Sequence, residues 1–254
     1  MSVWQEALQE AGAQYVLIEL TALDREHLRI DIGPYGVDGC LVVAGQEIPM
    51  ARIRSVYARP LELQKRWPTP DAVARGRILH EQFLEWLDVA RALVVSRPRA
   101  MQFNASKPLQ AQLIGEAGFG VPQTLVTSDE AEARAFWREH KRVIFKSVSG
   151  VRSIVQELDE HMARRLDRLA LLPTQFQAYV PGVDVRVHVV GKRTFAAEIQ
   201  SPVTDYRYAA RAGAAASLAG TELPCDVADR CVALAERMEL PLAGIDLRRR
   251  PDGE

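Results

Sequence analysis

The stretch from residue 175 to residue 200 constrains the fold of this chain more than any other segment. It reads QFQAYVPGVDVRVHVVGKRTFAAEIQ. Successive side chains of a strand point to opposite faces, so the valines at alternate positions from 183 to 189 share one face, and Asp184, Arg186 and His188 share the other. Pro181-Gly182 marks a tight bend before this strand, and Gly191-Lys192 marks a turn after it. The pattern predicts two neighbouring strands joined by a short turn.

The second strand alternates in the same way. Its apolar residues Phe195, Ala197 and Ile199 point away from its polar residues Thr194, Glu198 and Gln200. We therefore expect the polar residues of both strands to form one charge-rich face. Such a face is commonly the solvated side of an antiparallel sheet, and the alternative is a ligand site.

Two charged residues favour the ligand site. Lys146 lies in the apolar run VIFKSVSG, and Asp246 lies in LAGIDL. A buried lysine is costly unless it meets an anion, which a triphosphate would supply, and the small residues 147–150 could fold over phosphates as a loop. A buried carboxylate would be relieved by Mg²⁺ or, alternatively, by an ion pair with a nearby arginine.

Composition sets the limits of the function classes. The 254 residues are 48% hydrophobic and 26% charged, which is enough apolar material for one large or two small globular domains. The net charge of −1 gives no reason to expect nucleic acid or an anionic membrane as a partner, and we interpret the basic run 248–250 as a solvated strand end. Three cysteines without CxxC spacing argue against disulfides and zinc and favour a reducing cytoplasm.

Several common motifs are missing. The sequence contains no apolar run of about 18 residues, no signal peptide, and no P-loop, dinucleotide-binding, zinc-protease or hydrolase-elbow motif. These observations exclude a membrane span and remove the motif basis for those enzyme classes.

Helices and strands alternate along the chain, which predicts an α/β (α+β) fold. In a first domain, residues 1–96, we expect helices over 3–11 and 71–90 and strands at 15–20, 27–32, 39–43, 53–57 and 91–96. In a second domain, residues 97–254, Ser106 caps a helix that stops at Gly118, and Thr127 with Glu130 has capping-box spacing for a helix to about His140. Further helices are expected over 158–172 and around 227–238, with strands between.

From about residue 104 to its end, the sequence resembles the ATP-grasp ligases. It is most similar to the ribosomal-protein glutamate ligases and the microviridin-type peptide ligases that make graspetides. The motifs that carry the resemblance are SKPLQAQLIGEAGFGVPQTLVT, VIFKSVSG, QFQAYVPGVDVRVHVVG, TDYRYA and AGIDL. In the first domain, residues 57–60 (YARP) are similar to a segment of the peptide-modifying members. The resemblance implies an ATP-grasp fold over residues 97–254, with a lid subdomain at about 118–172 and a smaller pre-ATP-grasp domain before it.

The resemblance also implies roles for individual residues. Catalysis would fall to Arg207 and Lys146, and Mg²⁺ would bind Asp246. The residues implied to contact ATP are Lys107, Lys146, Ser149, Gly150, Gln177, Tyr179, Val180 and Asp184, with the backbone of 177–180 at the adenine and Asp184 near the ribose. The family's closing Glu-x-Asn metal motif is missing, so we expect residues 1–254 to be part of a longer protein.

The function implied is an ATP- and Mg²⁺-dependent ligase that activates a carboxylate as an acyl phosphate and joins it to a hydroxyl or amine in a ribosomally made peptide. The expected partner is a precursor peptide with a leader segment, and any oligomer is expected to be a homodimer. Two alternatives stay open: an amino-acid ligase of the glutamate-ligase type, and an ATP-binding protein without turnover.

Overall fold

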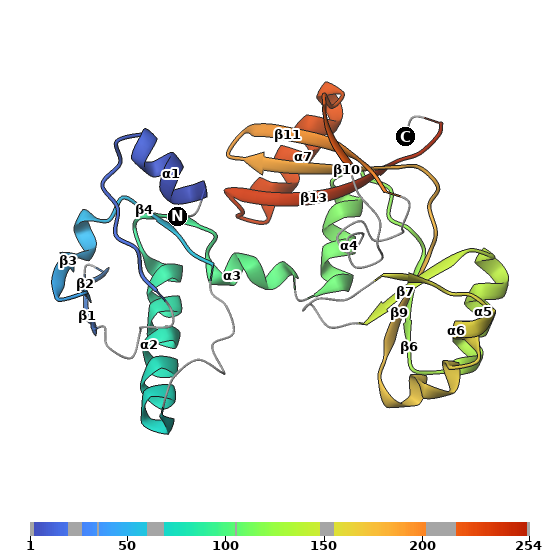
Figure 1. Cartoon of the computed structure of the whole chain (residues 1–254), viewed down its shortest axis with the longest axis horizontal. Coiled ribbons are helices and arrows are strands. Elements are labelled where there is room, and N and C mark those ends of the chain that lie inside the picture. Colours follow the sequence, from blue (N-terminus) through green and yellow to red (C-terminus); the bar gives the residue numbers. More distant parts are fainter. Residues whose placement is uncertain are drawn as a thin grey trace. The chain divides into compact units, whose positions relative to one another are not determined.

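The structure is a computed structural model of the whole chain, and it describes residues 3–19, 27–34, 36–59, 69–104, 106–147, 155–201 and 217–252. Internal contacts divide the chain into two compact units, Met1–Pro98 and Arg99–Glu254 (Figure 1). Within the described ranges, no helix combines the length and the apolar content that crossing a bilayer requires.

The first unit is built around one long helix. Besides the helices α1 and α2, it contains an antiparallel sheet with the strand order β1-β2-β3. It also contains a short 3₁₀ turn, η2, and a parallel pair of strands, β4 and β5. Their bounds are α1 Val3–Glu10, β1 His27–Gly33, β2 Gly36–Val43, β3 Gln46–Pro49, η2 Met50–Arg52, β4 Ser55–Tyr57, α2 Pro70–Val89 and β5 Leu93–Val95. Thr69 caps α2 by accepting the Ala72 N–H at 3.2 Å. Pro70 suits the first turn because it has no N–H that would need a hydrogen-bond acceptor there.

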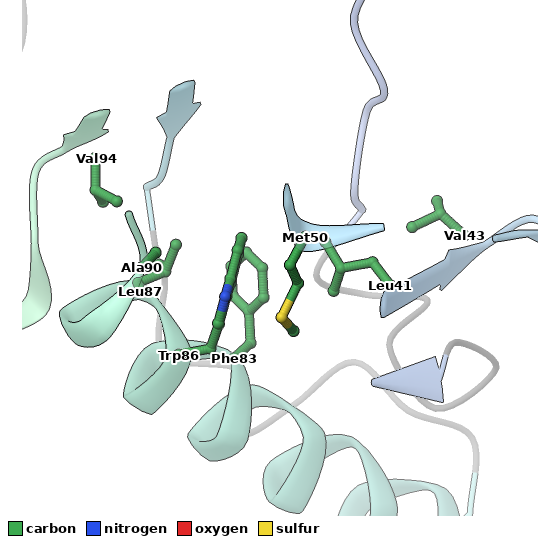
Figure 2. Close-up of a cluster of buried hydrophobic side chains, with 8 residues drawn as sticks. All are labelled: Leu41, Val43, Met50, Phe83, Trp86, Leu87, Ala90 and Val94. Atoms are coloured by element: carbon green, nitrogen blue, oxygen red, sulfur yellow. The ribbon is translucent and has the colours of Figure 1, made fainter. Parts of the chain in front are cut away.

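The core of the first unit gathers on one face of α2. Figure 2 shows Phe83 and Trp86 pointing from the helix toward Met50 and Leu41, and the two rings lie 5.6 Å apart. At the helix end, the Arg97 guanidinium donates to the carbonyls of Leu87, Asp88, Ala90 and Ala92 at 2.6–3.3 Å. This single side chain therefore satisfies carbonyls that the end of a helix leaves without partners.

The expected strand at 15–20 is wrong over its described residues. Residues 13–19 have no regular structure, and Tyr15, Val16 and Leu17 are exposed. A strand needs a partner for its backbone groups, and an apolar run alone does not supply one. The other strands expected in this unit are present as β1, β2, β4 and β5.

Over its described residues, the second unit contains two four-stranded sheets. The first, called here the β9 sheet, has the order β6-β9-β7-β8, and α5, α6 and the 3₁₀ segment η4 pack on one face of it (Figure 1). Its elements and those before it are α3 Pro98–Met101, η3 Gln102–Asn104, α4 Lys107–Glu116, β6 Thr124–Thr127, α5 Glu130–His140, β7 Val143–Ser147, β8 Gln156–Glu157, α6 Glu160–Ala163, η4 Leu166–Leu171 and β9 Thr174–Ala178. Ser106 caps α4 as expected, accepting the Leu109 N–H at 3.4 Å.

Two helix expectations in this part are corrected. The cap of α5 is Asp129, which accepts the Glu132 N–H at 3.0 Å, whereas Thr127, three residues before the helix begins, accepts the N–H of Asp129. The helix expected over 158–172 is split into α6 and η4. Its buried residues Ala163, Leu166 and Leu169 recur every three positions, which matches the 3.0-residue turn of a 3₁₀ helix better than the 3.6-residue turn of an α-helix.

The second sheet, called the β10 sheet, has the order β12-β11-β10-β13 and is antiparallel throughout. Its strands are β10 Val183–Val190, β11 Arg193–Gln200, β12 Ser217–Thr221 and β13 Leu242–Arg249, and α7, Cys225–Arg237, covers one face. Val185, Val187 and Val189 are buried against Cys231 and Ala235 of α7. The face that carries Asp184 and Arg186 is the opposite one.

The expected pooling of polar residues from β10 and β11 on one face is wrong. The turn holds two residues, so Val190 pairs with Arg193 and every even position of β10 meets an odd position of β11. Asp184 therefore lies opposite Ile199, Arg186 opposite Ala197 and His188 opposite Phe195. Glu198 lies opposite Val185, on the α7 side. The charges that accompany Asp184 and Arg186 come instead from β13.

Candidate active site

Lys146 lies on the face of the β9 sheet opposite to α5 and α6. Val143 and Phe145 point into the core beneath those helices, so Lys146, one position on, points the other way. Its direct partner on β9 is Gln175, and Val126 follows on β6. Gln175 is 5% exposed, and its Oε1 has no hydrogen-bond partner among the described residues. The half-buried Lys146 thus lies in a row with the buried Gln175 and with Val126.

The segment between the two sheets is held by Tyr179. Its N–H donates to the Arg142 carbonyl at 2.9 Å, and the N–H of Ala178 donates to the Gln123 carbonyl at 2.9 Å. These two N–H groups serve the fold, so a contact between adenine and residues 177–180 would fall to the other backbone groups of that segment.

Two arginines lie near the Tyr179 ring. The Cζ of Arg142 is 3.5 Å from the ring centroid, and the Cζ of Arg248 is 5.0 Å from it. Arg142 also donates twice to the carboxylate of Glu157 on β8, at 2.8 and 2.9 Å. These hydrogen bonds raise the pKa of the Arg142 guanidinium and lower the pKa of Glu157 from its usual 4.5.

Asp184, the residue expected near the ribose, forms an ion pair with Arg248. Arg248 Nη1 donates to Asp184 Oδ1 at 2.6 Å, and Arg248 Nη2 donates to the Tyr179 hydroxyl at 2.6 Å. Both charged side chains keep less than a third of their surface exposed. Interpreting 248–250 as a solvated strand end was therefore wrong for Arg248, which faces the site from β13.

Asp246, the residue expected to bind Mg²⁺, is 62% exposed and forms an ion pair with Arg186 at 2.7 Å. The carboxylate is not buried, so burial gives no reason for a metal, and the arginine alternative is the contact observed. A Cβ on Gly244 would lie 2.2 Å from Arg186 Nη2, so this glycine leaves the space in which the guanidinium lies.

A magnesium ion fits Asp246 as one ligand among several. Within the described residues, no three His, Cys, Asp or Glu side chains gather into a metal site. Mg²⁺ bound with a nucleotide usually takes one or two carboxylates and completes its shell with phosphate oxygens and water. A single carboxylate on an open face is compatible with that arrangement.

The remaining expected residues are placed only in part. Lys107 is the first residue of α4, and its Nζ donates to Gln110 Oε1 at 3.4 Å. Gln177 lies on the same face as Lys146, and its amide donates to Thr124 Oγ1 at 3.2 Å. Ser149, Gly150 and Arg207 lie outside the described residues.

A separate hollow of about 430 Å³ lies in the first unit between β1 and α2. It is lined by His27, Leu28, Asp71, Ala74, Arg75, Ile78 and Leu79. None of the expected site residues lies there, so the charged faces of the second unit are the better candidate for chemistry.

Sequence reasoning missed three arginines of the site: Arg142, Arg186 as a partner of Asp246, and Arg248. The signal for Arg248 was present. Along β13, Gly244, Asp246 and Arg248 alternate with Ala243, Ile245 and Leu247, which predicts that Asp246 and Arg248 share the open face. Arg142 carries no such signal, because its contacts join segments far apart in the chain.

No family model and no curated protein matches the chain. Solved structures do. The macrocyclase MdnC from Microcystis aeruginosa MRC, bound with its precursor peptide MdnA, matches with a TM-score of 0.79 at 16% identity, over 98% of this chain and 83% of that one. The RiPP-associated ATP-grasp ligase of Chryseobacterium gregarium, in complex with ADP and a leader and core peptide, matches with a TM-score of 0.79 at 20% identity, over 98% and 81%.

This chain has the ATP-grasp fold. A third match, the ATP-grasp ligase PsnB complexed with a minimal precursor, has a TM-score of 0.74 at 26% identity and covers 98% of this chain and 82% of that one. The matches extend over both units, so the ATP-grasp protein resembles these ligases in its first unit as well as in its two sheets.

Proposed function

We propose that this ATP-grasp protein is an ATP- and Mg²⁺-dependent ligase that forms side-chain ester or amide bonds in a ribosomally made precursor peptide. The observation that carries the proposal is the likeness over 98% of the chain to ligases whose structures hold precursor peptides or ADP. The charged faces around Lys146 and Asp184 support it, because a nucleotide is an anion with a polar sugar.

The proposed reaction has two steps. A carboxylate of the peptide attacks the γ-phosphate of ATP, which gives an acyl phosphate and ADP. A hydroxyl or amine of the same peptide then attacks the acyl carbon, phosphate leaves with the bonding electrons, and the nucleophile loses its proton. Each bond formed thus removes one water from the peptide.

The residues of this chain would bind and neutralise. Lys107, Lys146 and Arg207, with Ser149 and Gly150, are proposed to hold the phosphates, while residues 177–180 and Asp184 hold the adenosine. Mg²⁺ on Asp246 would supply charge to the transferring phosphate. We also propose that residues 1–96 form a pre-ATP-grasp domain and that residues 118–172 act as the lid.

The test combines nucleotide binding with mass spectrometry of a peptide. Lys146→Ala should weaken ATP binding by at least about tenfold, because it removes the charge partner of a phosphate. Lys192→Ala, in the exposed turn between β10 and β11, is the matched control and should leave the affinity unchanged. Equal affinity for ATP in wild type and a folded Lys146→Ala variant would contradict the assignment.

The peptide arm separates the candidate functions. A precursor with its leader should lose water when incubated with ATP and Mg²⁺, and the core alone should react more slowly. A gain of amino-acid mass would instead indicate the glutamate-ligase type of activity. ATP binding without any product would indicate a nucleotide-binding protein.

A further inference from the structure

Arg248 makes a contact to Tyr179 that the ladder between β10 and β13 does not need. The two strands are already paired along their whole length, from Val183 with Arg249 to Val190 with Leu242. A cross-strand ion pair adds little to such a ladder, and a half-buried pair can often be replaced by apolar residues without loss. Arg248 also keeps its Nε buried without a partner among the described residues. The stability of the fold alone therefore does not account for the contacts that Arg248 makes.

The geometry joins two parts of the proposed nucleotide site. One terminal nitrogen of Arg248 holds the Asp184 carboxylate, and the other holds the Tyr179 hydroxyl, each at 2.6 Å. Tyr179 cannot easily shift, because Arg142 covers its ring at 3.5 Å and is itself fixed by two hydrogen bonds to Glu157. The rigid guanidinium of Arg248 thus fixes the position of the Asp184 carboxylate relative to residues 177–180.

We infer that Arg248 is a positioning residue for the ribose of the nucleotide. It holds the Asp184 carboxylate in one orientation while the remaining lone pairs of that carboxylate accept hydrogen bonds from the ribose hydroxyls. A carboxylate has about four acceptor sites, and Arg248 Nη1 uses one of them. Because the same guanidinium binds Tyr179, the sugar and adenine contacts keep a fixed separation. This inference rests on the proposed function, since it assumes that the site binds a nucleotide.

The test measures how much the ribose hydroxyls contribute to binding. Calorimetry would compare ADP with 2′,3′-dideoxy-ADP for wild type, Asp184→Asn and Arg248→Met. Hydrogen bonds to a charged carboxylate should make wild type prefer ADP by at least about tenfold. Arg248→Met should lower this preference to about threefold or less by weakening ADP binding, while the affinity for dideoxy-ADP stays within about threefold of wild type.

Matched variants separate positioning from folding. Arg249→Met removes a neighbouring arginine that pairs with Glu198 at 2.6 Å on the other face of β13, and it should keep the preference for ADP. Arg248→Lys keeps the charge but cannot bind Asp184 and Tyr179 through a fork of two nitrogens, so it should restore part of the preference. It also provides a second readout if Arg248→Met does not fold.

Each other outcome is informative. If Arg248→Met weakens ADP and dideoxy-ADP equally, Arg248 serves the fold and the inference is wrong. A wild-type protein that binds both nucleotides equally well would remove the ribose role of Asp184, and the role of Arg248 with it. Failure of wild type to bind ADP at all would overturn the proposed function itself, which is a distinguishable result.

Discussion

Gly182 lies where the segment after β9 meets the end of β13, and its substitution by alanine should be costly. Its φ of +150° is in a region that is open essentially to glycine alone, which costs another residue about 1–3 kcal/mol. A Cβ there would lie 2.2 Å from the Arg249 carbonyl oxygen and 2.9 Å from its carbon. Both atoms belong to the backbone, so no side-chain rotation relieves the contact.

Relief requires the strands to separate. Contacts of a Cβ below 3.0 Å essentially do not occur, so the first pair of the β10–β13 ladder, Val183 with Arg249, must open by at least 0.8 Å. Losing a ladder hydrogen bond adds about 0.5–1.5 kcal/mol to the backbone strain. We expect Gly182→Ala to lower the free energy of unfolding by about 3 kcal/mol, or the melting temperature by about 6–12 °C.

Two other glycines serve as controls in urea and thermal unfolding. Gly191→Ala has a positive φ of 57° but no atom within 4 Å of its Cβ, so it isolates the backbone strain and should cost about 1 kcal/mol. Gly220→Ala in β12 has neither feature and should be close to neutral. A Gly182→Ala protein no less stable than Gly191→Ala would refute the reasoning, because it would mean that the close approach costs nothing.

Two further predictions concern the remaining parts of the chain. Arg97→Met should destabilise the first unit by about 2–3 kcal/mol in urea unfolding, because the carbonyls of Leu87 and Asp88 in α2 and those of Ala90 and Ala92 after it lose a charged donor. Arg77→Met breaks only an exposed pair with Glu81 at 3.8 Å and should change stability by less than about 0.5 kcal/mol; equal losses would show that Arg97 does not cap the helix. In iodoacetamide labelling near pH 8, followed by peptide mass mapping, the exposed Cys225 should react in the folded protein while Cys231, whose burial raises the pKa of its thiol to about 11, should react only after unfolding.

Local chemistry explains which parts of the fold were predictable. Ser106 lies directly before a helix with proline in its first turn, and the alternation at 183–190 specifies a strand, so both follow from neighbours in the chain. The segment 15–19 shows the limit, because its apolar residues resemble a strand while the partner it would need is absent among the described elements. The sequence pattern of one segment does not show which distant segment it pairs with.

The candidate site divides in the same way. Lys146 was singled out because it is a charge in an apolar run, and Asp184 because alternation places it on the polar face of its strand; the structure puts Lys146 opposite Gln175 and Asp184 opposite Arg248. Asp246 was assigned to the right strand, but its burial was overestimated because the neighbours Ile245 and Leu247 point to the opposite face. Arg142 could not be found, since its stacking on Tyr179 and its pair with Glu157 depend on how β7, β8 and β9 come together.

The charges of β10 and β13 also specify how these strands pair. Asp184 meets Arg248 and Arg186 meets Asp246, so the signs are reversed between neighbouring pairs. A slip of two residues in one direction would place Asp184 opposite Asp246, and a slip in the other would place Arg186 opposite Arg248. Like charges directly opposite each other destabilise a sheet, and a slip of one residue would expose the valines that α7 covers. The residues proposed to bind the nucleotide and its metal therefore owe their fixed spacing to the same charges that select the register.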